Sequence, residues 1–128
     1  MKSLELTIVG PIKGGKNNMC VTRTGRHYPK PEWASWRDGV VLLLRGQNQA
    51  KITFDSPSQV EARYWRGDNR RRDIPAMIDS VWHCLERAGI VADDTFLEDC
   101  DWRCMGLDRE RPRLELLIST KEAPPCPI

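Results

Sequence analysis

Two amphipathic segments, each opened by a proline and ended by a glycine, most constrain the fold of this chain. The first begins at Pro31 and stops at Gly46, and the second runs from Pro75 to about Ala88, before Gly89. Proline in the first turn and glycine after the last turn are typical of helix ends. The apolar residues of the second segment recur at helical spacing: Ile78, Val81, Trp82 and Leu85. The pattern therefore predicts two helices that each bury one face.

Short strand-like segments surround the two predicted helices. Residues 4–9 alternate between apolar and polar, and residues 51–54, 60–65, 97–105 and 113–119 also have strand patterns. The order β-α-β-β-α-β-β predicts the α+β class, with a mixed sheet and both helices on one face. We expect one small domain over residues 1–121. Residues 122–128, with three prolines, are expected to form a disordered tail.

Charge is divided unevenly along the chain, although its net charge is only +2. Residues 1–72 hold 14 basic and 6 acidic residues, whereas residues 73–128 hold 6 basic and 12 acidic residues. This division is compatible with a surface that holds a polyanion beside cations. It is equally compatible with a neutral surface in which folding interleaves the charges.

Several classes of protein are disfavoured by what the sequence contains. No apolar run approaches the roughly 18–20 residues that a membrane-spanning helix needs. The five cysteines lack the spacing of a zinc site, and Gly14-Gly15 lacks the context of a nucleotide-binding loop. We therefore expect a cytoplasmic protein with reduced thiols, no membrane partner and no nucleotide cofactor.

Acidic residues lie at both ends of the second predicted helix. Asp73 precedes it, Asp79 lies within it, and Asp93 and Asp94 follow it. Carboxylates hold Mg²⁺ in enzymes that hydrolyse phosphodiesters, although such residues also serve as helix caps and surface charge. The run Arg70–Arg72 directly before Asp73 favours a site that draws a phosphate backbone onto a metal. The alternative is local pairing of these arginines, as of Arg70 with Asp68.

The stretch from Arg70 to Asp94 resembles the signature of the RusA family of Holliday-junction resolvases. That signature is a basic run, Asp-x-Asp-Asn, a helix of about three turns, a glycine and then Asp-Asp. The spacing from Asp73 to Asp94 fits it without a gap. Similar features outside this stretch are Gly10-Pro11, Asn17-Asn18, Arg23-x-x-Arg26 and Arg113-Leu114-Glu115-Leu116. The resemblance thus spans nearly the whole predicted domain.

The resemblance implies a bacterial or phage-encoded homodimer that nicks four-way DNA junctions symmetrically during recombination and repair. It implies Mg²⁺, or Mn²⁺, as the cofactor. Asp73 and Asp94 match the first and last acidic positions of the family, and Asp93 precedes the last one as the family has it. The basic residues in regions that face DNA in the family are Lys13, Lys16, Arg23, Arg26, Arg70, Arg71 and Arg72.

The chain departs from the family at the second acidic position, where Pro75 stands in place of Asp and is followed by Ala76 in place of Asn. Our hypothesis is that Asp79, about 6 Å further along the helix axis, supplies the missing catalytic and metal-binding carboxylate. His83 is a second candidate for that ligand. The competing interpretations are a catalytically impaired protein that still binds junctions, and a protein that self-associates through its uneven charge.

Overall fold

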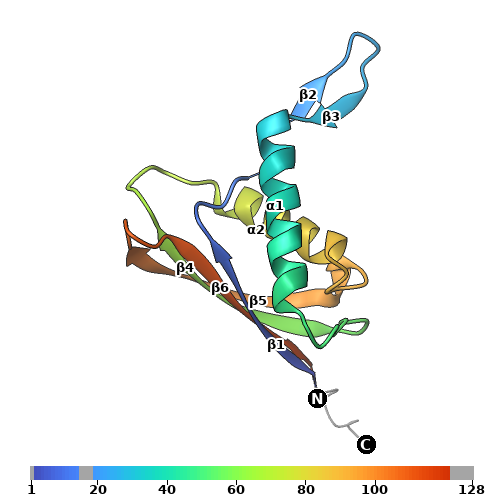
Figure 1. Ribbon diagram of the computed structural model, residues 1–128, viewed down its shortest axis with the longest axis vertical. Coiled ribbons are helices and arrows are strands. Elements are labelled where there is room, and N and C mark those ends of the chain that lie inside the picture. The colour runs from blue at the N-terminus through green and yellow to red at the C-terminus, as the bar shows by residue number, and fades with distance from the viewer. Residues whose placement is uncertain (1, 15–18, 122–128) are drawn as a thin grey trace, which may run out of the picture.

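The computed structural model describes residues 2–14 and 19–121, which form one mixed sheet, one small hairpin and two helices. The sheet has the order β1 (Ser3–Val9), β6 (Arg113–Thr120), β4 (Ser58–Arg66) and β5 (Leu97–Leu107). Figure 1 shows the longer helix, α1 (Pro31–Gln47), crossing in front of this sheet beside α2 (Ile74–Arg87). The predicted α+β class is confirmed. The predicted tail and Lys16 lie outside the described residues.

The core lies between the helices and one face of the sheet. Alternate residues of the strands are buried, which is the period of two expected for strands with one covered face. The buried residues include Ile8, Val60, Leu114, Leu116 and Ile118 from the sheet and Leu44, Val81 and Leu85 from the helices. Trp82, from the predicted apolar stripe of the second helix, is also buried, and so is Trp33. Among the described residues, no helix has the length and apolar character to span a membrane.

The parallel pair β4 and β5 sets the layout of the rest of the fold. β1, β6 and β4 pair antiparallel with their neighbours, but β5 runs parallel to β4, so the chain must cross back over the sheet between them. Helix α2 makes this crossover. Residues 67–73 therefore lie at the carboxyl end of β4, and the short 3₁₀ helix η1 (Asp94–Phe96) lies at the opposite end.

Local signals explain the helix ends. The carboxylate of Asp73 caps α2 by accepting a hydrogen bond from the Ala76 N–H at 3.2 Å, and Gly89, with φ +75°, ends the helix in a left-handed conformation. Helix α1 continues one residue past the predicted stop at Gly46. The Gln47 side chain there exchanges two hydrogen bonds of 2.7 and 2.8 Å with the backbone of Thr7 in β1. These bonds hold the last turn in place.

Two predictions about strands were wrong. Residues 51–54 form no strand, because the Asn48 side chain bonds both backbone groups of Ile52 and Lys51 has a positive φ of +53°. Only Phe54 makes an isolated bridge, to Val91. Residues 19–21 and 27–29, for which no strand is predicted, form the hairpin of β2 (Met19–Val21) and β3 (His27–Pro29), whose turn uses Gly25 at φ +83°.

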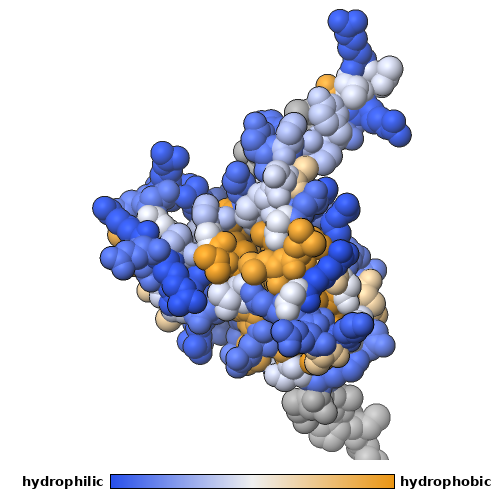
Figure 2. Space-filling model, viewed as in Figure 1, coloured by the Kyte–Doolittle hydropathy of each residue, from blue (hydrophilic) through white to orange (hydrophobic). Residues whose placement is uncertain are grey.

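Exposed apolar side chains gather over the middle of α1. Leu42 is 68% exposed and Leu43 is 37% exposed, and Figure 2 shows apolar surface at this place among hydrophilic residues. Scattered exposed leucines are common on monomeric proteins. Leu42 and Leu43 nevertheless offer a second surface through which another protein could contact the chain.

Neighbouring leucines of β6 test the position of the core. Leu116 is buried under the helices, whereas Leu117 faces the other side of the sheet and is half-buried. Leu116→Ala should lower the free energy of unfolding by about 2–5 kcal/mol, because it leaves a cavity. Leu117→Ala should cost clearly less. Chemical denaturation of both variants measures the difference, and equal losses would contradict this burial pattern.

The cap of α2 gives a second stability prediction. Asp73→Ala removes the acceptor for the Ala76 N–H and should cost about 1 kcal/mol, whereas Asp73→Asn keeps an acceptor and should change stability little. Urea denaturation of both variants measures this difference. A cost as large for Asn as for Ala would show that the charge, not the cap, stabilises this end of α2.

Candidate functional site

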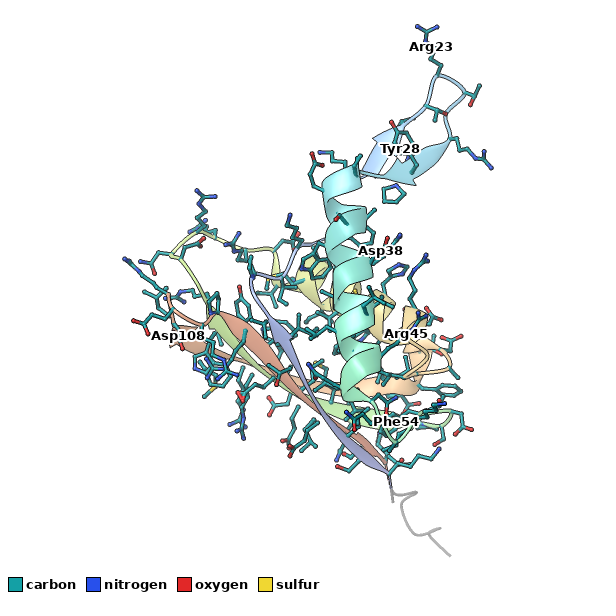
Figure 3. The ribbon with its side chains drawn as sticks, viewed as in Figure 1. Arg23, Tyr28, Asp38, Arg45, Phe54 and Asp108 are labelled. Carbon is teal, nitrogen blue, oxygen red and sulfur yellow. The ribbon has the colours of Figure 1, made fainter. Side chains whose placement is uncertain are left out.

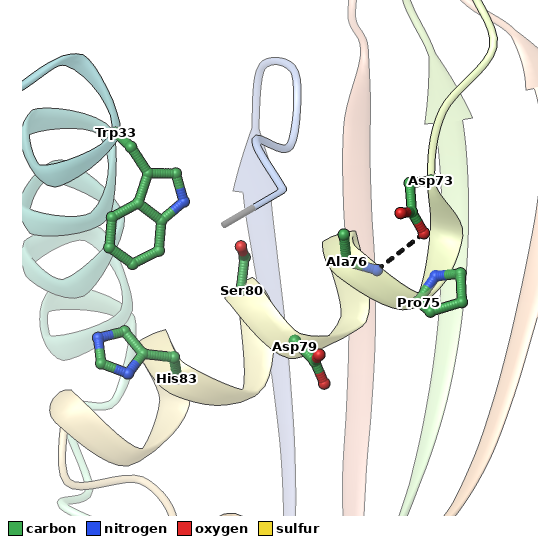
Figure 4. A pocket seen from close by; sticks show the side chains of 7 residues that line it. All are labelled: Trp33, Asp73, Pro75, Ala76, Asp79, Ser80 and His83. Carbon is green, nitrogen blue, oxygen red and sulfur yellow. Dashed lines mark hydrogen bonds between the residues drawn. The ribbon is translucent and has the colours of Figure 1, made fainter. Parts of the chain in front are cut away.

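The predicted acidic residues Asp73 and Asp79 line one pocket. This pocket has a volume of about 510 Å³ and lies between the first turns of α1 and one side of α2. Its lining, shown in Figure 4, consists of Trp33, Asp73, Pro75, Ala76, Asp79, Ser80 and His83. Two of the four acidic residues that the sequence singled out thus line one pocket, although their carboxylates point in different directions in Figure 4.

The two carboxylates differ in how firmly they are held. Asp73 is exposed but oriented, because it caps α2 through the Ala76 N–H. Asp79 is exposed on the following turns of the same helix, and its carboxylate has no hydrogen-bond or ion-pair partner among the residues that the structure describes. A carboxylate in this state keeps its oxygens available for a cation or for water.

The other end of the pocket is formed by an aromatic pair and a serine. The rings of Trp33 and His83 lie 5.7 Å apart between centroids, and the two side chains face each other in Figure 4. Ser80 is only 2% exposed, and its Oγ has no partner within the described chain. The sequence analysis singles out neither Trp33 nor Ser80 for this site. Nothing in the sequence around Ser80 marks this serine as a functional residue.

His83 is biased toward its neutral form. Burial lowers the pKa of its imidazole below 6.5, and the nearby cations Arg37 and Arg87 lower it further. Its Nε2 is buried and has no partner in the described residues. A neutral imidazole can accept a proton or bind a metal. This is consistent with the hypothesis that His83 serves the same site as Asp79.

Asp93 and Asp94 do not line this pocket. Both follow the C-terminal end of α2, whereas Asp73 precedes its first residue, and a helix of 14 residues is about 21 Å long. Asp93 instead accepts hydrogen bonds from the N–H and Oγ1 of Thr95 at 2.9 and 2.8 Å, which lowers the pKa of its carboxyl group. Over residues 2–14 and 19–121, no three His, Cys, Asp or Glu side chains form a metal-holding group. Asp94 nevertheless lies near the His83 end of the pocket, because its negative charge opposes the lowering of the His83 pKa.

A basic surface adjoins the acidic pocket. A second pocket, of about 590 Å³, is lined by residues that include Lys13 and Arg70–Arg72, and it shares Asp73 and Ala76 with the first. Trp33 connects the two regions, because its Nε1 donates to the carbonyl of Lys13 at 3.3 Å. Four of the predicted DNA-binding residues therefore lie beside the carboxylate that caps α2.

Asp68 shapes the basic loop without neutralising all of it. Its carboxylate accepts a hydrogen bond from the backbone N–H of Arg70 at 3.0 Å and binds the guanidinium of Arg72 at 2.9 Å. The side chains of Arg70 and Arg71 are exposed, and neither forms an ion pair within the described part of the chain. The alternative of local pairing thus holds for Arg72, and it leaves two guanidinium groups accessible to an anion.

The remaining predicted basic residues lie elsewhere. Arg23 and Arg26 are exposed at the turn of the β2–β3 hairpin, which projects beyond the N-terminal end of α1 in Figures 1 and 3. The Thr22 N–H donates to the Arg26 carbonyl at 2.8 Å and closes this turn. The sequence around Gly25 carries the turn signal that identifies the hairpin.

Comparison with known proteins gives one distant likeness. The chain is 24% identical over 97 residues to the crossover junction endodeoxyribonuclease RusA of Aquifex aeolicus (strain VF5), and the match covers 76% of each chain. No family model matches the chain. The likeness supports a relationship to RusA-like proteins weakly, and it agrees with the family that the motif around Asp73 resembles.

Proposed function

We propose that the protein is a structure-selective endodeoxyribonuclease that resolves Holliday junctions and other branched DNA. One observation carries this proposal: two carboxylates, Asp73 and Asp79, line a pocket that adjoins a surface formed by Lys13 and Arg70–Arg72. A nuclease needs both kinds of group. Its basic side chains hold the phosphate backbone, and its carboxylates bind the metal ion that acts on one phosphate. The distant likeness to a RusA enzyme supports the same class of substrate.

The donors in the pocket fit Mg²⁺, with Mn²⁺ as a substitute. Proteins commonly bind Mg²⁺ through one or two carboxylates and leave its other positions to water and substrate phosphates. Asp73 and Asp79 would provide those carboxylates, and their exposure leaves room for a phosphate. When bound, the ion would supply an activated water and would offset negative charge on the phosphate.

The protein's own residues would bind and orient the DNA. Arg70, Arg71 and Lys13 would hold backbone phosphates, and these contacts carry no base preference. Asp73 is fixed by its cap, so its carboxylate is presented in one orientation. The neutral imidazole of His83 would accept a proton at Nε2 or complete the ligand set beside Asp79. Arg23 and Arg26, on the projecting hairpin, would contact a more distant part of the same junction.

We propose that Asp93 and Asp94 act through a homodimer. Neither residue lines the pocket that holds Asp73, and both follow the C-terminal end of α2. A junction with two-fold symmetry suits a symmetric dimer that nicks two strands. A protein with this substrate would act in the cytoplasm of a bacterial or phage-infected cell.

Pro75 favours a second candidate function. It lines the pocket at the position where the RusA signature has an aspartate, and it offers no ligand. A protein of this kind could bind junctions without cutting them. The two candidates differ in whether strand cleavage accompanies binding, so one substrate distinguishes them.

Cleavage of a synthetic four-way junction tests the proposed function. With Mg²⁺ the wild type should make paired nicks, and EDTA should abolish them. Asp73→Asn and Asp79→Asn should each reduce cutting to the level seen with EDTA while leaving junction binding within a few-fold of the wild type. Glu61→Gln is the control, because Glu61 is an exposed acid on the uncovered face of the sheet and lines neither pocket.

Each outcome has one interpretation. Normal cutting by Asp79→Asn together with loss in His83→Ala assigns the second ligand to His83. Normal cutting by Asp73→Asn overturns the proposed site. Binding without nicks by the wild type, with Mg²⁺ or with Mn²⁺, overturns the nuclease and supports the impaired junction-binding protein.

The basic surface gives a separate prediction about affinity. Each phosphate contact contributes about 0.9 to the slope of log K against log salt concentration. The double variant Arg70→Gln/Arg71→Gln should therefore lower this slope by roughly 2 and weaken binding to all sequences alike. Arg63→Gln, on the uncovered face of the sheet, should leave the slope unchanged. Fluorescence anisotropy across a salt series measures both, and an unchanged slope in the double variant would remove this loop from the DNA interface.

A further inference from the structure

Strand β5 is an exposed edge of the sheet. It is 11 residues long, it pairs with β4 along one side, and no described strand pairs with its other side. Most of its residues are exposed, including the apolar Met105 at 47% and Leu107 at 40%. Long uncovered edges present free backbone N–H and C=O groups and readily pair with another chain.

The middle of β5 has a sequence that is complementary to itself when reversed. Cys100-Asp101-Trp102-Arg103-Cys104 has a cysteine at each end and opposite charges on either side of Trp102. This segment lies in the regular part of the ladder, where Val60–Tyr64 of β4 pair with it residue by residue. The register shifts between Tyr64 and Trp65, so the regular part ends at Cys104.

We propose that two copies of the chain pair antiparallel through β5, with the two-fold axis at Trp102. Asp101 of each copy then lies opposite Arg103 of the other, and each Cys100 lies opposite a Cys104. The two Trp102 side chains lie opposite each other at the axis. Opposite charges and aromatic pairs are favourable when they face each other across antiparallel strands.

The charges select this register over its neighbours. An axis at Asp101 would place the two Asp101 carboxylates opposite each other, and an axis at Arg103 would do the same for the guanidinium groups. Like charges that face each other directly are unfavourable. Within one copy, Asp101 and Arg103 already pair at 3.0 Å while 56% and 68% exposed. Pairing of the strands converts these two exposed pairs into one ladder of four alternating charges.

The helices leave this edge accessible. Cys100 and Cys104 are exposed although they lie on the strand face that carries Trp102, whose ring packs 5.8 Å from Tyr64. The joined sheet would have the order β1-β6-β4-β5-β5-β4-β6-β1. A two-fold axis perpendicular to the sheet keeps all four helices on one face, so both Asp73 pockets open toward the same side.

The register also relates the two ends of α2. The N-terminal end of β5 in one copy runs beside the C-terminal end of β5 in the other, where Leu107 pairs with Arg66 at the carboxyl end of β4. Asp94, just before β5, therefore lies at the same end of the joined sheet as Asp73 of the other copy. This interface would join the homodimer of the proposed function, on which the inference rests. Dimer formation can be measured without DNA and without metal. An experiment that disproves the interface therefore leaves the proposed nuclease activity open, and an experiment that disproves the activity leaves the interface open.

Charge variants test the pairing directly. Asp101→Arg places arginine opposite Arg103, and Arg103→Asp places aspartate opposite Asp101, so each variant alone should be monomeric. Mixed in equal amounts, the two should form a heterodimer in which every opposed pair is attractive again. Sedimentation velocity of each variant, the mixture and the wild type measures this. Dimers of either single variant, or no recovery on mixing, would overturn the proposed register.

Thiol trapping tests the register independently of charge. In a Cys20→Ser/Cys126→Ser background, diamide should join two copies through Cys100 and Cys104; each disulfide passes two electrons and two protons to diamide, which becomes a hydrazine. Cys100→Ser or Cys104→Ser alone should give no covalent dimer, since every link needs one of each. A mixture of the two should give a singly linked heterodimer. A wild-type dimer that none of these variants changes would place the contact elsewhere, as on the Leu42–Leu43 face of α1, and would overturn the proposal.

Discussion

The parallel pairing of β4 with β5 is the constraint on which the other features of this structure depend. Parallel neighbours cannot be joined by a tight turn, so α2 must cross the covered face of the sheet between them. This crossover places the arginine-rich loop and Asp73 at the carboxyl end of β4. It also places Asp93 and Asp94 at the opposite end and leaves β5 as the edge.

The candidate site follows from that crossover and from the periodicity of α2. Asp79, Ser80 and His83 lie on the side of the helix that turns toward the start of α1, where Trp33 closes the pocket. The same helix begins at the loop that carries Arg70 and Arg71, so acidic and basic groups meet at Asp73. The basic first part of the sequence and the acidic part that starts at Asp73 thus meet in the lining of one pocket.

Much of the fold could be predicted from local signals, because proline and glycine mark both helices and alternation marks the strands of the main sheet. Residues 51–54 were missed because a side chain, that of Asn48, takes the backbone bonds a strand would use. Asp73 and Asp79 could be placed together because both belong to one helix. The position of Asp94 could not, because the direction in which the chain leaves α2 is set by pairing with β4, which is remote in the sequence.

The proposed reaction depends on a divalent cation that we propose binds at Asp73 and Asp79. Paramagnetic Mn²⁺ broadens NMR signals only near its binding site, so titration into the ¹⁵N-labelled protein locates the ion without DNA and without turnover. We expect broadening centred on the amides of residues 73–83, and its loss in Asp79→Asn. Broadening centred on Asp93 and Asp94 without residues 73–79, or none at any residue, would contradict it.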